Sequence, residues 1–451
     1  MLRKVYSKLV SGVIFPIQEK LKGHSTVLVR EGLERSQWWA TEALYDLQLE
    51  RLRELLNYAN SHVPYYRCLF KNLSFDCNIK SLGDLVKLPL LTKADIRLNL
   101  DAFKAEGADT LSRFNTGGSS GEPLVFFIGN ERVSHDVAAK WRATRWWGVD
   151  IGDPEIVVWG SPIELGSQDF VRAIRDKLFR TTLLPAFEMS EAKLDGFIVR
   201  IRHFKPSMLF GYPSALAHIA KHACSKGVAM DDLGIKVAFV TSERLYDKQR
   251  ENIERVFGCK VANGYGGRDA GFIAHECPEG GMHITAEDII VEIVDQAGNV
   301  LPMGQAGEIV ITHLATKDFP FIRYRTGDVA VLDEKNCKCG RGLPLIKEIQ
   351  GRSTDFVIAA DGTVMHGLSL IYVIRDVKGV ENFKITQESI ELTRVELMVS
   401  DEFSEKSINT ICEGIGQRLG EEARVDVKVV ANIAAEKSGK FRYVISRVAQ
   451  G

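Results

Sequence analysis

Short apolar runs alternate with helical segments between residues 156 and 262, and this alternation limits the fold more than any other feature of the chain. Helical spacing of apolar residues separates several of the runs, notably over residues 213–224 and 247–256. Strands that alternate with helices form mainly parallel sheets, because each helix returns the chain to the edge where the next strand begins. The sequence therefore predicts an α/β layer with strands at residues 156–159, 208–210, 237–240 and 261–262.

The pattern becomes β-rich after residue 288. Apolar and β-branched residues dominate residues 289–294, 307–311 and 329–332, and residues 296–299 have the composition of a turn. Strands joined by short turns pair with their neighbours in sequence. We therefore expect an antiparallel sheet or a small barrel in this region.

A domain boundary is predicted near Gly351. Beyond it, strand-like segments surround a helix-like segment at residues 405–419, which is typical of an α+β domain of about 100 residues. The predicted fold class is thus α/β. A large N-terminal domain (residues 1–350) contains mixed and parallel sheets and a small β-barrel-like part, and a smaller α+β domain covers residues 351–451.

Composition excludes several classes of protein. The formal net charge of −1 gives no electrostatic reason to expect nucleic-acid binding. No apolar run reaches the roughly 20 residues that span a bilayer. Eight cysteines in 451 residues do not form the dense framework of a small secreted domain, so a reducing cytoplasm is the expected location.

The N-terminal segment has apolar residues at helical spacing beside Arg3, Lys4 and Lys8. It is not a good signal peptide, because Lys8 interrupts the apolar stretch and no small-residue cleavage site follows. Residues 1–20 could make weak contact with a membrane surface. A helix docked on its own protein is the simpler interpretation.

A loop rich in glycine and hydroxyl groups covers residues 116–121, just before a strand-like run. Glycines allow backbone amides to approach phosphate closely, and hydroxyls add hydrogen-bond donors. The loop lacks the lysine of the common phosphate-binding loop. It is either a phosphate-binding loop of another kind or a surface turn.

Carboxylates in two further motifs suit other parts of a nucleotide. In residues 265–269, Asp269 could hold magnesium and Tyr265 could stack on a base. In residues 323–328, Asp328 could accept hydrogen bonds from the two hydroxyls of ribose. Alone, the first motif also fits the glycine-rich end of a strand, and the second a charged turn. Lys440, between a glycine and the chain end, could neutralise developing charge or belong to a solvated basic tail.

Three thiols and an imidazole form a separate group, made by Cys277, His283, Cys337 and Cys339. Three sulfur ligands and one nitrogen ligand are a common closed shell for structural zinc. The Cys-x-Cys spacing of the second pair is tighter than the usual knuckle, so two reduced turns with a surface histidine are the alternative. His275 is a weaker candidate than His283.

The order of these motifs, from residue 63 to Lys440, resembles the adenylate-forming enzymes. More narrowly, it resembles the phenylacetate–coenzyme A ligase family and its CapK-like branch, which is associated with capsular polysaccharide synthesis. Residues 281–288 and 339–341 look specific to this branch. The resemblance implies ATP-dependent activation of a carboxylic acid as acyl-AMP, with magnesium, followed by acyl transfer, usually to coenzyme A. Branch members also carry a metal near the site, which favours the zinc interpretation.

The resemblance implies a role for each matched position. Lys440, Asp269 and Arg268 would be the catalytic residues, and Tyr212, Pro213 and Gly264 part of the acyl pocket. Thr354 and Asp355 would be the hinge about which a mobile C-terminal domain rotates. The residues that would bind ATP or AMP are Thr116, Gly117, Gly118, Ser119, Ser120, Gly121, Ser242, Glu243, Tyr265, Gly266, Asp328 and Arg352.

The sequence departs from the family pattern at two places, and these departures leave the acid substrate and the acyl acceptor open. Arg268–Asp269 replaces the usual Thr/Ser–Glu pair, and Thr354 stands where a hinge aspartate is common. The leading hypothesis is ligation to coenzyme A. The alternatives are transfer to an amine or hydroxyl of a sugar precursor, and a binding or scaffold protein that has lost activity. The sequence predicts neither the acid nor the oligomeric state.

Overall fold

The chain divides into two compact units, which we describe separately. The larger comprises residues 1–326 and 330–348, and the smaller comprises residues 327–329 and 349–451. The computed structural model describes residues 2–116, 124–159, 170–186, 189–352, 356–361, 364–375, 377–420, 422–433 and 442–448.

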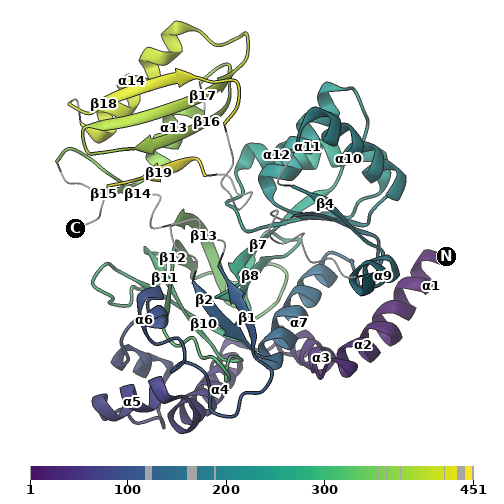
Figure 1. Ribbon diagram of the computed structural model, residues 1–451, viewed down its shortest axis with the longest axis vertical. Helices are drawn as coiled ribbons and strands as arrows, with labels where there is room; N and C mark the ends of the chain where they lie inside the picture. Colours follow the sequence, from purple (N-terminus) through teal and green to yellow (C-terminus); the bar gives the residue numbers. More distant parts are fainter. Residues whose placement is uncertain are drawn as a thin grey trace. The chain divides into compact units, whose positions relative to one another are not determined.

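Helices dominate the start of the larger unit (Figure 1). They are α1 (Leu2–Leu9), α2 (Phe15–Leu21), α3 (Thr26–Ser36), α4 (Thr41–His62), α5 (Pro64–Leu73) and α6 (Lys93–Leu98). A π-helical turn η1 (Val10–Ile14) joins α1 to α2, and two 3-10 turns are η2 (Leu82–Lys87) and η3 (Asp231–Leu233). The helix α4 matches the apolar spacing of its sequence, and Pro64 opens α5 directly after it, where the missing amide hydrogen costs nothing.

One sheet of eleven strands organises the larger unit, in the order β10-β11-β12-β13-β9-β8-β7-β6-β5-β3-β4. Its parallel part is made of β3 (Glu155–Trp159), β4 (Thr181–Pro185), β5 (Met208–Gly211), β6 (Val237–Thr241) and β7 (Lys260–Gly267). The predicted parallel layer is therefore confirmed.

Helices cover both faces of the parallel part. Leu209, Ala238 and Val240 belong to a buried core with α10 (Glu191–Phe204), α11 (Pro213–Ser225) and α12 (Asp247–Phe257). Phe210 and Phe239, on the opposite face, pack with residues of α7 (Asn130–Trp146). Successive strand residues point to opposite faces, so strands buried on both faces are apolar throughout. A further helix, α9 (Phe170–Leu178), precedes β4.

The β-rich region continues the same sheet. Its strands are β8 (Gly271–Glu276), β9 (Met282–Ile284), β10 (Ile289–Val294), β11 (Ala306–His313), β12 (Tyr324–Asp333) and β13 (Leu345–Arg352). The antiparallel pairing of β7 with β8 joins the two parts. Of the two expected arrangements the antiparallel sheet is the one found, since its strands run on into the parallel layer instead of forming a separate barrel. The strands β1 (Ser112–Asn115) and β2 (Val125–Ile128) form a separate hairpin.

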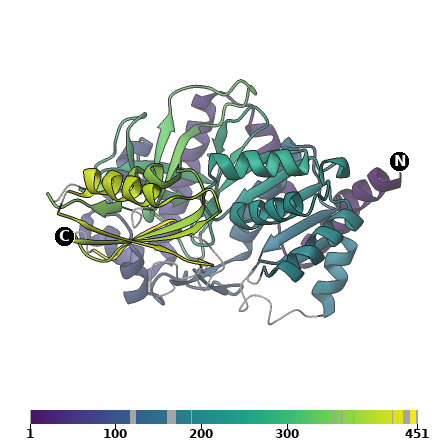
Figure 2. The same ribbon diagram turned by 90° about the horizontal axis from the view of Figure 1, so that it is seen from above.

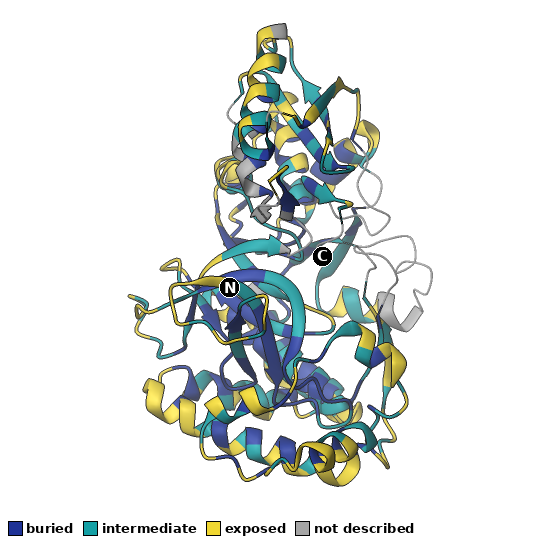
Figure 3. Ribbon diagram, turned by 90° about the vertical axis from the view of Figure 1, so that its left-hand side faces the viewer, coloured by how far each residue is buried: buried dark blue, intermediate teal, exposed yellow. Residues whose placement is uncertain are grey.

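The smaller unit is an α+β fold. Its sheet has the order β18-β17-β16-β19, and a hairpin of β14 (Phe356–Ile358) and β15 (Val364–His366) precedes it. The four strands are β16 (Val380–Gln387), β17 (Leu392–Val399), β18 (Arg424–Val429) and β19 (Val444–Ser446). The helices α13 (Leu368–Arg375) and α14 (Glu405–Leu419) pack on each other and on the sheet. Figure 3 shows buried residues along the strands and exposed residues on the outer helix faces.

Candidate functional site

Several predicted site residues lie where parallel strands end. Tyr212 follows β5, Ser242 follows β6, and Tyr265 lies near the end of β7. The register pairs Gly211 with Val240 and Thr241 with Gly264, so these strands reach one edge of the sheet together. In open α/β sheets, ligands bind at the carboxyl ends of the strands. The fold thus places the predicted nucleotide and acyl segments at the edge where a ligand is expected.

Glu243 connects two of these segments. Its carboxylate accepts a hydrogen bond of 3.2 Å from the backbone amide of Ser214, in the first turn of α11. A carboxylate is favourable there, because the first amides of a helix lack partners within the helix. The preceding Ser242 has a φ of +71°, a conformation that is uncommon for residues other than glycine and that concentrates at functional sites.

The turn between β7 and β8 carries Arg268 and Asp269. The hydroxyl of Tyr324, at the start of β12, donates a hydrogen bond of 2.6 Å to a carboxylate oxygen of Asp269. Tyr324 is fully buried, whereas Asp269 keeps intermediate exposure. Two motifs that are 55 residues apart in the sequence therefore meet at this carboxylate.

A buried arginine supports the same turn from α7. The Nη2 of Arg132 donates to the carbonyl oxygens of Arg268 (3.3 Å) and Asp269 (3.5 Å). Its Nε donates to the carboxylate of Asp136, one helical turn further along α7, at 2.9 Å. The side chain of Arg132 is only 2% exposed, and these hydrogen bonds hold its orientation firmly. This contact fixes the backbone from which the Asp269 carboxylate projects.

The glycine-rich loop begins beside this turn. The guanidinium of Arg268 donates to the carbonyl oxygen of Asn115 at 3.5 Å. Thr116 closes the base of the loop, since its hydroxyl accepts from the amide of Leu124 at 2.9 Å and its own amide donates to the Leu124 carbonyl at 3.0 Å. The Thr116 and Arg268 segments are therefore neighbours, as a site shared between the motifs requires.

The arginines beside Asp328 are occupied by carboxylates. Arg323 pairs with Glu292 at 3.0 Å, and Arg325 donates to Glu308 at 2.9 Å. Both arginines therefore neutralise neighbouring carboxylates. Asp328 itself lies on β12 with intermediate exposure.

Some of the remaining predicted residues lie in the described part of the chain, and others lie outside it. Tyr212 and Gly264 are buried, and Pro213 opens α11. Gly266 pairs with Phe272 across the β7–β8 hairpin, and Arg352 ends β13. The predicted residues that lie outside the described part of the chain are Gly117, Gly118, Ser119, Ser120, Gly121, Thr354, Asp355 and Lys440.

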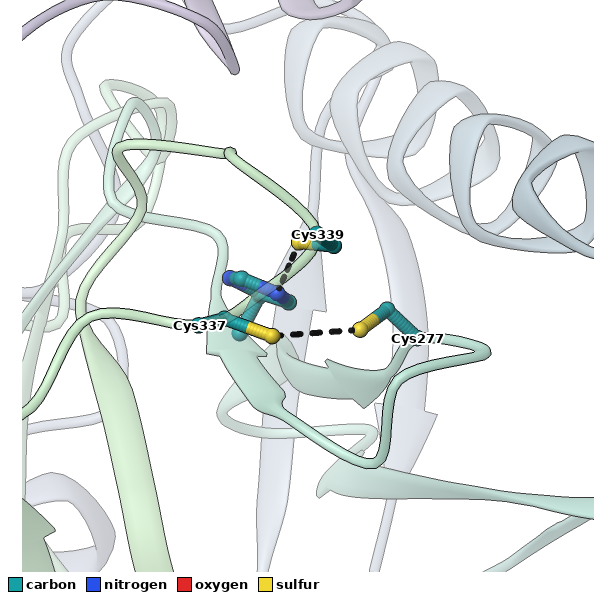
Figure 4. Close-up of side chains that lie close together, drawn as sticks. Cys277, Cys337 and Cys339 are labelled. Atoms are coloured by element: carbon teal, nitrogen blue, oxygen red, sulfur yellow. Dashed lines mark hydrogen bonds between the residues drawn. The ribbon is translucent and has the colours of Figure 1, made fainter.

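The three cysteines converge on one point (Figure 4), and His283 belongs to the same cluster. Their ligand atoms all lie within 4.8 Å of one another. The Sγ atoms of Cys277 and Cys337 are 3.6 Å apart, and the Sγ of Cys339 is 3.2 Å from Nε2 of His283. Ligands at about 2.3 Å (sulfur) and 2.0 Å (nitrogen) from a tetrahedral zinc ion are separated by roughly 3.5–3.8 Å. The distance between the Cys277 and Cys337 sulfurs lies in this range, and all four ligand atoms are close enough together to surround one zinc ion.

The chemistry of the four groups also suits a metal. Nδ1 of His283 lies 3.3 Å from the carbonyl oxygen of Leu343, which directs Nε2 toward the thiols. Burial lowers the pKa of His283 to about 4, so the imidazole is neutral near pH 7, as a ligand must be. Burial also raises the pKa of Cys277 to about 12, and a cation at the centre would oppose this by favouring the thiolate.

The local backbone is built around this point. A Cβ added at Gly281 would lie 2.6 Å from the Sγ of Cys337, so no larger residue fits there. The amide of Cys277 donates to the carbonyl of Gly281 at 2.9 Å and closes the turn that carries the first cysteine. His275 does not belong to the cluster; it packs between Phe239 and Phe272.

The acidic end of the 281–288 motif holds the fold together. Glu287 pairs with Arg142 at 2.7 Å, and both side chains are 1% exposed. Asp288 accepts from Arg51 at 2.9 Å and lies 2.7 Å from Nδ1 of His135. These buried pairs attach α4 and α7 to the sheet, so this part of the motif has a structural role.

Sequence reasoning missed three residues of the site. Trp159, at the end of β3, stacks on Tyr212 with ring centroids 4.3 Å apart and adds an aromatic wall at the carboxyl edge. Tyr324 and Arg132 contact the Asp269 turn. The position of Trp159 at a strand end was a usable signal; the other two depend on contacts between distant segments.

Two family models match the chain. The AMP-binding enzyme model matches residues 183–315, and the CapK C-terminal domain model matches residues 357–447. Protein CapK of Staphylococcus aureus is 25% identical over 418 residues, which are 90% of each chain. A phenylacetate-coenzyme A ligase of Pseudomonas putida is 29% identical over 327 residues, which are 71% of this chain and 73% of that protein.

A solved structure confirms the fold. The crystal structure of 2-hydroxyisobutyryl-CoA ligase in the postadenylation state with 2-HIB-AMP superposes with a TM-score of 0.76. It covers 92% of this chain and 91% of the other at 21% sequence identity. The predicted fold class and the predicted class of enzyme, an AMP-forming ligase, are thus confirmed: residues 183–315 match the AMP-binding enzyme family, and the chain is similar to CapK and to phenylacetate–coenzyme A ligases over most of its length.

Proposed function

We propose that this chain joins a carboxylic acid to AMP and then transfers the acyl group to the thiol of coenzyme A. One observation carries the proposal: the predicted nucleotide and acyl segments end together at the carboxyl edge of the parallel sheet of an AMP-binding enzyme. Related folds support both half-reactions, because 2-hydroxyisobutyryl-CoA ligase has been solved with 2-HIB-AMP and with coenzyme A.

The first half-reaction forms a bond between a carboxylate oxygen and the α-phosphorus of ATP, while pyrophosphate leaves. In our proposal, Asp269 holds magnesium, which would neutralise phosphate charge when bound. The Tyr324 hydroxyl at 2.6 Å and the Arg132 contacts to the turn keep this carboxylate in place. Tyr265 stacks on adenine, and Asp328 accepts from the ribose hydroxyls, with Arg352 close by.

Lys440 is the proposed source of positive charge between the carboxylate and the phosphate. A cation aimed at developing charge is typically worth a factor on the order of 10² or more in rate. In the second half-reaction, the thiolate attacks the acyl carbon and AMP leaves with the original carboxylate oxygen. Thr354 and Asp355 remain the proposed hinge between the two half-reactions.

Zinc completes the proposal as a structural ion. Cys277, His283, Cys337 and Cys339 would hold it, and four protein ligands leave no open position for a substrate. The ion would join the β8–β9 hairpin to the segment between β12 and β13.

A second candidate keeps the adenylation step but changes the acceptor. The relation to CapK extends over 90% of the chain, and the C-terminal model that matches residues 357–447 is that of CapK. That observation favours an amine or hydroxyl of a sugar precursor as the alternative acceptor, in capsular polysaccharide synthesis. Arg268, which replaces a hydroxyl residue, suits an anionic substrate in either case.

ATP–pyrophosphate exchange with magnesium tests the proposal. The assay is run across a panel of aryl, fatty, amino and uronic acids. Exchange with one class establishes adenylation, and added coenzyme A then separates the two acceptors by whether a thioester forms. Exchange with no acid, together with no binding of ATP, would refute the proposal and favour a scaffold protein.

Lys440→Ala separates an enzyme from a scaffold. The variant should lose exchange by about 10²-fold or more while the chain stays folded. Lys428→Ala, at an exposed lysine on β18, is the matched control and should keep the activity. Near-normal exchange by Lys440→Ala would show that this lysine is not the catalytic one.

A further inference from the structure

A line of exposed apolar side chains runs along the first three helical elements. Every fourth residue belongs to it, and the exposed fractions are 60% for Val5, 48% for Leu9, 46% for Val13, 56% for Ile17 and 84% for Leu21. At about 1.5 Å per residue, the line is roughly 24 Å long. We call these five residues the N-terminal stripe. An uncovered apolar line of this length needs an explanation, since single exposed apolar residues are normal but continuous ones are not.

The opposite side of the same segment is fixed to the larger unit. The hydroxyl of Ser7 donates to Asp153 at 2.6 Å, and that of Tyr6 donates to the carbonyl of Leu178 at 2.8 Å. Phe15 packs edge-on against Trp141, with ring centroids 5.1 Å apart. Val10 fits against Gly152, where an added Cβ would lie 2.5 Å away. The segment is therefore held as a rigid element, and its stripe faces outward.

The π-helical turn keeps the stripe on one side. In an α-helix of 3.6 residues per turn, a four-residue repeat overshoots each turn by about 40° and would wind around the helix. The turn η1 (Val10–Ile14) takes more residues per turn and offsets part of this drift midway along the segment. The π-helical turn therefore keeps the apolar residues of the four-residue repeat on one exposed face of the segment.

The charges beside the stripe are positive. Lys4, Lys8 and Lys20 are exposed and follow the same four-residue spacing, one position before Val5, Leu9 and Leu21. The single acid among the first 30 residues is Glu19, which is buried and held by Thr26 at 2.5 Å and by His24 at 3.0 Å. The chain as a whole has a net charge of −1. Its first 30 residues nevertheless present an apolar line beside a row of cations, without an exposed acid.

The neighbouring helix α9 extends this character. The Tyr6 hydrogen bond and the guanidinium of Arg180, 4.6 Å above the Tyr6 ring, attach the end of α9 to α1. Ile174 and Leu178 of α9 are exposed apolar residues as well. Figures 1 and 2 show α1 and α2 projecting along the rim of the larger unit, beside α9.

We propose that the N-terminal stripe lies flat on the surface of an anionic lipid bilayer. Valine, leucine and isoleucine would enter the boundary between headgroups and acyl chains, and the lysines would remain among the headgroups. In the described part of the chain no helix is long and apolar enough to cross a membrane. A second copy of the chain fits less well, because a two-fold interface brings each patch onto itself and would oppose lysine to lysine.

Vesicle sedimentation with the full chain tests the proposal. The probes are vesicles of phosphatidylcholine alone and of phosphatidylcholine with phosphatidylglycerol, at low and high salt. We expect binding to the anionic vesicles and weaker binding as salt rises. Lys4→Gln with Lys8→Gln should lower the partition coefficient about fivefold per lysine. Leu9→Gln with Ile17→Gln should lower it on the order of tenfold or more.

Matched controls change exposed residues of the same kind elsewhere. Lys71→Gln with Lys80→Gln removes two exposed lysines, and Leu98→Gln changes a leucine that is 82% exposed on α6. These variants should bind as the parent does. Thermal unfolding of every variant checks folding, and Leu21→Gln, at an 84% exposed position, replaces any stripe variant that does not fold.

Binding that the stripe variants lose and the controls keep supports the proposal. No binding to anionic vesicles, or equal binding by parent and stripe variants, overturns it. The proposal is also overturned if the parent protein does not bind vesicles but forms a dimer that the Leu9→Gln with Ile17→Gln variant dissociates. That result would assign the stripe to contact with a second copy of the chain.

Discussion

The cysteine–histidine cluster and the Asp269 turn lie in one sheet but are built in opposite ways. Three thiols and an imidazole lie within 4.8 Å of one another, so their ligand atoms can all bind the same ion. Asp269 receives one hydrogen bond from a buried tyrosine, and the residue keeps intermediate exposure.

The difference indicates what each region can do. A shell of four protein ligands satisfies a zinc ion completely, which stabilises a fold but leaves no place for a reactant. The Asp269 carboxylate is held by the Tyr324 hydroxyl, and Arg132 holds the backbone carbonyls of its turn, so the carboxylate can still bind a further group, as catalysis requires. We therefore expect substitutions in the Asp269 turn to lower activity without lowering stability. Substitutions in the cysteine–histidine cluster should lower stability before they affect activity.

Asp269→Asn should show the largest effect. The amide has the same shape and can still accept from Tyr324, but it lacks the charge that would hold magnesium. We expect ATP–pyrophosphate exchange to fall by a factor on the order of 10², with an unchanged midpoint of thermal unfolding. Asp401→Asn, at an exposed aspartate of the smaller unit, is the control and should have no effect. A loss of stability that matches the loss of activity would mean that the turn is structural too.

Cys339→Ser should lower stability first. Serine is a poor zinc ligand, so the variant should lose the equivalent of zinc that metal analysis is expected to find in the parent protein. The midpoint of thermal unfolding should fall by roughly 5–10 °C, the size expected for a lost structural ligand. Cys68→Ser, at an exposed cysteine, should change neither the metal content nor the midpoint. Parent protein without stoichiometric zinc would remove the metal from the account.

Tyr324→Phe should lower activity less than Asp269→Asn does. It removes one hydrogen bond to a charged acceptor, which contributes about 1.5 kcal/mol, and leaves Asp269 free to rotate. We expect the KM for magnesium–ATP to rise about fivefold to twentyfold. Tyr66→Phe removes another buried hydroxyl, which donates to the carbonyl of Pro320, and should lower stability but leave this KM unchanged. An unchanged KM in Tyr324→Phe would mean that the contact does not orient Asp269.

Much of the fold could be predicted because its signals are local. The strands at 208–210 and 237–240 are apolar throughout because helices bury both faces, and the structure places strands at both. The continuity of the parallel and antiparallel strands was not predicted. It depends on the pairing of β7 with β8 around a tight turn, which local composition does not specify.

The cluster was easier to predict than the turn. Cysteine and histidine are few in the chain, and they bind metals in a small number of known combinations. Few groupings of these residues therefore had to be considered. The contact between Tyr324 and Asp269 joins segments that have no shared pattern, and tyrosine and aspartate have many roles. For the same reason the sequence predicted a helix at the N-terminus without the outward face of its stripe, since which side docks depends on Gly152, Asp153 and Trp141.

The fate of the substrate oxygen tests the central claim most directly. Once exchange has identified an acid, its carboxylate is labelled with oxygen-18 and the complete reaction is run with the acceptor. The account predicts that AMP is released with one labelled oxygen, because acyl transfer breaks the bond between the acyl carbon and that oxygen. Label in inorganic phosphate with release of ADP, or AMP without label, would contradict an acyl-adenylate.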